Sequence, residues 1–209
     1  MFLHQMQVGR MAVFAYIVGD QASGEGLVID PAGEVNRLVK TATDNEITVK
    51  YIVNTHGHVD HMTGNAEMKA KTGAQIVVHK DDAELVMFMP APIFRMHGAE
   101  KSPHPDVVVN DGDEIKVGEI SLLVIHTPGH TLGGMSLYTE GYVFTGDTLF
   151  VESVGSTAFP GGSWPTLRHS IMERLFTLPD DTVVLPGHNY GRMPSSTIGH
   201  EKMYNPFLK

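Results

Sequence analysis

The sequence predicts an α/β (α+β) fold in which two β-sheets pack face to face and helices cover the outside. Short runs rich in Val, Ile and Leu alternate with stretches of helical period, and Gly and Pro turns separate them. Each half of the chain has strand patterns first, with helices interleaved, which suits a layered architecture. No low-complexity linker divides the halves, so we expect residues 1–209 to form a single domain.

The first half alternates strand and helix patterns. Runs of apolar residues bounded by turns predict strands over Met11–Val18, Gly26–Ile29, Thr48–Val53 and Gln75–His79. Apolar residues at helical spacing predict helices over Glu34–Asn45, Asn65–Thr72 and Asp81–Phe88. Gly73 is expected to end the second of these helices, and the prolines after Phe88 to end the third.

The second half repeats this pattern. Strands are predicted over Ile115–Val117, Ser121–His126, Met135–Tyr138, Tyr142–Thr145 and Thr182–Leu185, and a helix over Pro165–Leu178.

The segment Phe88–Pro105 fits neither pattern, because it carries four prolines and no clean period. We expect a long loop there. Its Phe and Met side chains suit a substrate lid or a contact surface, including one between two copies of the chain. The alternative is that Phe94 and Met96 cover the core.

Composition narrows the classes of function. The chain has 15 basic and 24 acidic residues, a net charge of −9, and the basic residues are scattered. We therefore expect no nucleic-acid partner. No apolar run is long enough to span a membrane, and no signal peptide is visible. Cysteine is absent, which excludes thiolate ligands and is compatible with a cytoplasmic location.

Seven polar residues stand where predicted strands give way to turns containing Gly or Pro. They are His56, His58, Asp60, His61, His130, Asp147 and His188. A lone histidine beside a glycine is more often a solvated turn residue than a ligand. Four acid or imidazole groups within six residues, however, would be costly to bury without a metal ion or partners.

Imidazole and carboxylate groups suit zinc, iron or manganese, and seven of them exceed what one tetrahedral ion needs. The sequence therefore predicts two divalent ions that share a carboxylate. Zinc is the expected metal, with iron or manganese also compatible.

The stretches THGHVDHMTGN, TPGHTLGG, FTGDTLF and LPGHNYG resemble the successive metal-binding motifs of the metallo-β-lactamase superfamily. The resemblance implies an αββα four-layer sandwich. It also implies one metal on His56, His58 and His130, a second on Asp60, His61 and His188, and Asp147 as the bridge. Asp30 resembles the aspartate that orients a ligand in this family. The alternative is an ordinary aspartate in the turn that ends a strand.

Within the superfamily, the motifs are most similar to those of glyoxalase II. This similarity implies hydrolysis of thioesters such as S-lactoylglutathione by a hydroxide held between the metals, with Asp60 and Asp147 as the catalytic carboxylates. The main alternative is a persulfide dioxygenase with one iron on His56, His130 and Asp147. A lactone or phosphoester hydrolase is a further alternative. All of these act on a small molecule.

Two details bear on the substrate. Glutathione-dependent relatives commonly carry a basic and an acidic residue after the bridging aspartate, and persulfide dioxygenases tend to carry the same pair. Here Ser156 and Ala158 stand at those positions. Tyr190 matches the tyrosine on the family's substrate side, where its hydroxyl would donate to the ligand. An amphipathic, half-buried ring is the alternative.

Overall fold

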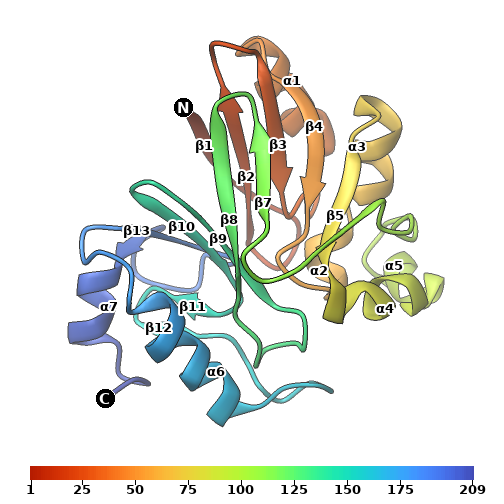
Figure 1. Cartoon of the computed structure of the whole chain (residues 1–209). Coiled ribbons are helices and arrows are strands. Elements are labelled where there is room, and N and C mark those ends of the chain that lie inside the picture. The colour runs from red at the N-terminus through yellow and green to blue at the C-terminus, as the bar shows by residue number, and fades with distance from the viewer.

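The computed structural model describes residues 1–209 and consists of two six-stranded sheets packed face to face, with helices on both outer faces (Figure 1). This arrangement confirms the predicted fold class.

The first sheet has the strand order β1-β2-β3-β4-β5-β6. Its first three strands pair antiparallel, and β3 to β6 pair parallel. The strands are β1 (Phe2–Val8), β2 (Val13–Asp20), β3 (Glu25–Ile29), β4 (Thr48–Val53), β5 (Gln75–His79) and β6 (Val107–Val109).

The second sheet has the order β14-β13-β10-β9-β8-β7 and is antiparallel except for the pair of β10 with β13. Its strands are β7 (Glu114–Val117), β8 (Ile120–His126), β9 (Met135–Thr139), β10 (Tyr142–Gly146), β13 (Val183–Pro186) and β14 (Ser196–Thr197). Two short strands, β11 (Leu149–Phe150) and β12 (Ser153–Val154), form a separate hairpin.

The helices lie at the outer faces and edges of the sheets (Figure 1). They are α1 (Val35–Asp44), α2 (Val59–Met62), α3 (Asn65–Thr72), α4 (Lys80–Phe88), α5 (Ala91–Met96), α6 (Trp164–Ser170), the π-helical turn η1 (Ile171–Leu175) and α7 (Ile198–Tyr204). None of them is long and apolar enough to cross a membrane.

The four structural layers are helices, sheet, sheet and helices, and a layer of apolar side chains lies between each two of them. The side chains of β2, which point alternately to its two faces, show how the sequence produces these apolar layers. Ile17 points into the cluster shared with α1 and α3, whereas its neighbours Tyr16 and Val18 point into the cluster between the sheets. Successive strand residues face opposite sides, so a strand buried on both faces is apolar throughout. The third cluster joins the second sheet to α6 and α7, through residues such as Val143 and Leu167.

Most predicted elements are present within a few residues of their predicted bounds, but the structure adds several elements and divides one. Strand β1, whose Gln and His residues hide its alternation, was not expected. Neither were the helices α2 and α7 and the short strands β6, β11, β12 and β14. The predicted helix over Pro165–Leu178 divides into α6 and η1.

The expectation of a structureless loop over Phe88–Pro105 was wrong, because α5 forms within it. Pro92 stands in the first turn of α5, where the missing N–H costs no hydrogen bond. Phe94 is fully buried, as one of the two interpretations required, whereas Met96 is 80% exposed and does not cover the core.

Candidate metal centre

The structure brings all seven predicted ligand residues together, at the edge where the two sheets meet. Four of them follow β4, in the turn and short helix α2, and His130, Asp147 and His188 follow β8, β10 and β13. Loops at the ends of rigid strands hold converging side chains precisely. Each sheet therefore supplies part of the centre.

Their ligand atoms form overlapping groups of three, in each of which the atoms lie within 4.8 Å of one another. The groups are His56, His58 and His130; His56, His61 and Asp147; and Asp60, His61 and His188. We call the line where the ligand loops of the two sheets meet the seam. Across it, His58 Nδ1 lies 2.8 Å from His130 Nε2, and His61 Nε2 lies 3.1 Å from His188 Nε2.

The opposite ring nitrogen of several histidines is held by an oxygen outside the cluster. His130 Nδ1 lies 2.5 Å from the carbonyl oxygen of Ser156, and His188 Nδ1 lies 2.8 Å from that of Met11. A carbonyl only accepts, so both Nδ1 atoms carry the proton and both Nε2 lone pairs face inward. The charged side chain missing at position 156 is therefore not needed to orient His130.

Asp30 is hydrogen-bonded to His61. Its carboxylate accepts from the backbone N–H of Thr55 at 2.8 Å, from the Thr55 hydroxyl at 2.7 Å and from His61 Nδ1 at 3.0 Å. Asp30 is 1% exposed and adopts a left-handed backbone conformation with φ 46°. Burial, strain and these contacts fit the orienting role better than that of an ordinary turn aspartate.

Asp82 was missed by sequence reasoning. It lies in the first turn of α4 and is 1% exposed. Its carboxylate accepts from Gly57 N at 2.7 Å, from Thr131 Oγ1 at 2.8 Å and from Gly133 N at 2.6 Å. Asp82 thus joins the turn between His56 and His58 to the loop that carries His130. The available signal was its position just after a strand end, like the ligands themselves.

The charges of the centre are strongly coupled. Burial, with His130 next in effect, lowers the pKa of His58 to about 4. Burial alone would lower the pKa of His61 too, but the carboxylates of Asp147 and Asp30 raise it to about 10. Burial opposes ionisation of Asp147, yet the neighbouring His61 holds its pKa well below the usual range.

Two buried polar atoms of this cluster, His56 Nε2 and Asp147 Oδ1, have no hydrogen-bond partner. An unpaired buried polar atom is costly, and a metal ion would satisfy both. The Nε2 lone pairs of His130 and His188 also point inward. A neutral imidazole nitrogen is a ligand that both zinc and iron bind. The residues present therefore fit a metal centre.

Space around the centre is tightly limited. Gly155 packs so closely against the segment that carries Asp147 that a Cβ atom on Gly155 would lie 1.8 Å from the carbonyl oxygen of Asp147. On the outer side, the rings of Phe159 and Tyr190 flank the histidines. Tyr190 stacks on His188 with ring centroids 4.4 Å apart, and Phe159 meets His58 edge-on at 5.3 Å.

Tyr190 therefore lies beside the centre, as predicted. It is 54% exposed. Burial and the nearby Asp147 raise its pKa, so the hydroxyl keeps its proton and can donate.

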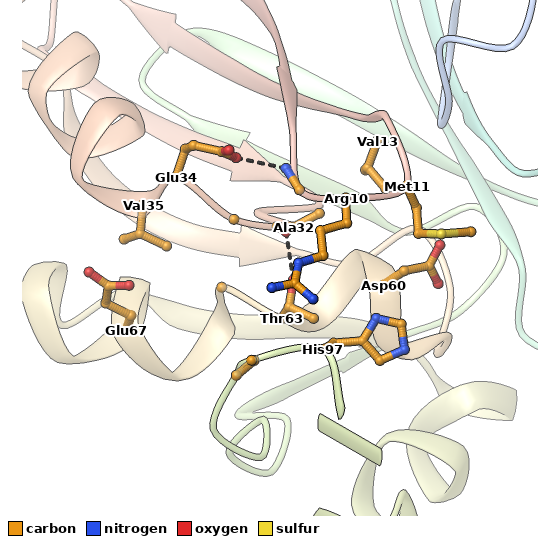
Figure 2. A pocket seen from close by; sticks show the side chains of 15 residues that line it. Arg10, Met11, Val13, Ala32, Glu34, Val35, Asp60, Thr63, Glu67 and His97 are labelled. Carbon is orange, nitrogen blue, oxygen red and sulfur yellow. Dashed lines mark hydrogen bonds between the residues drawn. The ribbon is translucent and has the colours of Figure 1, made fainter. Parts of the chain in front are cut away.

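A cavity of about 340 Å³ adjoins the centre (Figure 2). Asp60 and Met11 form part of its wall. The turn after β1, the segment from the end of β3 into α1, the segment from α2 into α3, and the loop after α5 also line it. The segment expected as a loop thus contributes His97 to this wall.

Comparison with known proteins agrees with this geometry. The model of the metallo-β-lactamase superfamily matches residues 8–188. The human mitochondrial persulfide dioxygenase ETHE1 is 34% identical over 210 residues, which cover 99% of this chain and 75% of that protein.

Solved structures of proteins with this fold are also similar to the chain. ETHE1 from Myxococcus xanthus superposes with a TM-score of 0.86 at 32% identity, covering 99% of this chain and 84% of that one. The B3 metallo-β-lactamase BLEG-1 gives 0.88 at 28% identity over the full length of both. TTHA1623 in a di-iron-bound form gives 0.85 at 30% identity, covering 98% of this chain and 100% of that one. The chain therefore belongs to the metallo-β-lactamase superfamily.

Proposed function

We propose that this chain is a persulfide dioxygenase, which oxidises the terminal sulfur of a thiol persulfide with dioxygen. One structural observation carries the proposal. His56 Nε2 and Asp147 Oδ1 are the two partnerless atoms of the cluster, and His130 Nε2 lies 3.4 Å from Asp147 Oδ2. Two imidazoles and one carboxylate are the ligands that hold iron for oxygen chemistry.

The relatives support this choice over the glyoxalase II-like alternative. The human protein and the Myxococcus xanthus structure are both described as ETHE1, and the human one as a persulfide dioxygenase. Each matches at least 98% of this chain at over 30% identity. The function expected first, thioester hydrolysis, therefore becomes the second candidate.

Residues of this chain would prepare the site in three ways. Ser156 holds the His130 ring with Nε2 inward, and Asp82 fixes the spacing of the two ligand loops. The exposed rings of Phe159 and Tyr190 provide an aromatic border that suits a soft sulfur atom. An iron ion held by His56, His130 and Asp147 would supply the activation of dioxygen.

A two-metal thioester hydrolase has its own supporting observation. Asp60, His61 and His188 form a complete second group of ligands, and TTHA1623 is described in a di-iron-bound form. Two ions would supply an activated water and polarise the substrate carbonyl.

Three measurements on one sample distinguish the persulfide dioxygenase from the thioester hydrolase. The purified protein is analysed for metal content, for oxygen uptake and sulfite release with glutathione persulfide, and for hydrolysis of S-lactoylglutathione. The proposal predicts about one iron per chain, oxygen consumption, and no thioester cleavage. The matched control is His56→Ala, which removes a ligand and should abolish oxygen uptake. Two metals per chain with thioester cleavage and no oxygen uptake would contradict the proposal.

A further inference from the structure

The cavity beside the metal centre has a charged lining that none of the ligand roles explains. Figure 2 shows the Arg10 side chain, from the turn after β1, directed into the cavity toward Thr63 and His97. Asp60 lies on the same side as His97, so a molecule that fills the cavity reaches the centre.

Arg10 is available to a ligand. The arginines that form ion pairs are Arg174, with Asp111, and Arg192, with Glu152. Arg10 has no such pair, and its exposed side chain lines the cavity. A guanidinium presents a rigid fork of donors that matches a carboxylate with two parallel hydrogen bonds.

The opposite side of the cavity is acidic. Glu34 and Glu67 line it there, away from Asp60 and His97 (Figure 2). Glu34 Oε2 accepts from Gly9 N at 2.7 Å, and Glu67 Oε1 lies 3.6 Å from Lys71 Nζ, at the exposed rim. A phosphate group would meet repulsion from these carboxylates. An α-amino acid group carries a carboxylate and an ammonium side by side and matches both signs.

We propose that this cavity binds the α-amino acid end group of the substrate, with its carboxylate on Arg10 and its ammonium toward Glu67. The reacting sulfur then lies at the metal centre, so the inference rests on the proposed function for the choice of a thiol-derived substrate. It also explains how charge is recognised although Ser156 and Ala158 are uncharged. The charged contacts come instead from Arg10 in the β1–β2 turn and from Glu67 in α3.

Binding is tested with S-methylglutathione, an unreactive probe with a free α-amino acid group, by titration calorimetry on the metal-loaded protein. Arg10→Ala should weaken binding about 10- to 100-fold, which corresponds to the loss of one charge-assisted bidentate pair. Arg10→Lys should lose less, because it keeps the charge. The matched control is Arg37→Ala on the exposed face of α1, which should bind like wild type. Equal binding by wild type and Arg10→Ala, or no binding by wild type at millimolar probe, would overturn the inference.

A second comparison addresses the acidic side. Glu67→Gln should weaken S-methylglutathione but not S-methyl-3-mercaptopropionate, which has a carboxylate and no ammonium. An equal effect on the two probes would remove the ammonium contact from the proposal. Both measurements are independent of turnover. If wild type binds the probe through Arg10 yet consumes no oxygen with a persulfide, the proposed function fails and the binding site stands.

Discussion

Replacing Asp82 by Asn tests the idea that one buried carboxylate joins the two ligand loops. Asp82 Oδ2 accepts from both Gly57 N and Thr131 Oγ1, and Oδ1 accepts from Gly133 N. An amide offers one oxygen in place of two. If that oxygen stays with Gly133, the NH₂ group faces the N–H of Gly57, and two donors oppose each other.

The magnitude follows from these contacts. A hydrogen bond to a charged group contributes about 1.5–3 kcal/mol, and a buried donor left without a partner costs about 1–3 kcal/mol. Loss of the Gly57 bond, together with weakening of the bond to Gly133, should lower the free energy of unfolding by about 3–5 kcal/mol. The Thr131 hydroxyl can rotate to accept from the amide, so its contribution is small.

The assay is urea unfolding of the metal-free protein, because bound metal would add its own stabilisation. The control is Asp81→Asn. Asp81 is the preceding residue, its side chain is 41% exposed, and exposed ion pairs are worth about 0–1 kcal/mol. If Asp82→Asn lost no more stability than Asp81→Asn, the reasoning about the joined loops would be refuted.

Three further predictions concern the ligands. Asp147→Ala should fold but lose bound metal and all oxygen uptake, and full metal content measured by elemental analysis would contradict its assignment. Asp60→Ala should keep persulfide oxidation within about tenfold of wild type, since the 2-His-1-carboxylate set excludes it; a complete loss of oxygen uptake would favour the two-metal hydrolase. His61, with its pKa raised to about 10, is protonated in the metal-free protein at neutral pH and stabilises the fold most below pH 6.5, an effect lost as pH rises through 10. One iron on His56, His130 and Asp147 leaves this proton in place, so metal loading at pH 7.5 should release no proton from His61. Release of about one proton, measured by calorimetry in buffers of different ionisation enthalpy, would show a metal on His61 and favour the two-metal hydrolase.

How much the sequence reveals depends on whether a role lies in a side chain or in the backbone. His56, His58 and Asp60 stand close together in the sequence, so their convergence was predictable. The oxygen atoms that orient His130 and His188 belong to the backbone of Ser156 and Met11. Any residue type supplies a carbonyl, so no residue pattern could indicate them.

The fold was predictable for a related reason. Strands such as β2 and β5 are buried on both faces and read as continuous apolar runs. Strand β1 pairs with only one neighbour and is half-exposed, so its polar residues hide it. Helix α5 is short and contains a proline, and its one buried anchor, Phe94, gives no repeat to detect.

The division of the ligands between the two sheets also matters for how the chain is held together. The chain has no cysteine and therefore no disulfide, yet the rings of His56 and His130, far apart in the sequence, lie 4.8 Å from each other across the seam. An iron ion on these two residues would cross-link distant segments, and cross-links that close long loops restrict the unfolded chain most. Removing the metal should thus allow the halves to open along the seam, with amide exchange rising at both ligand loops before the strands behind them.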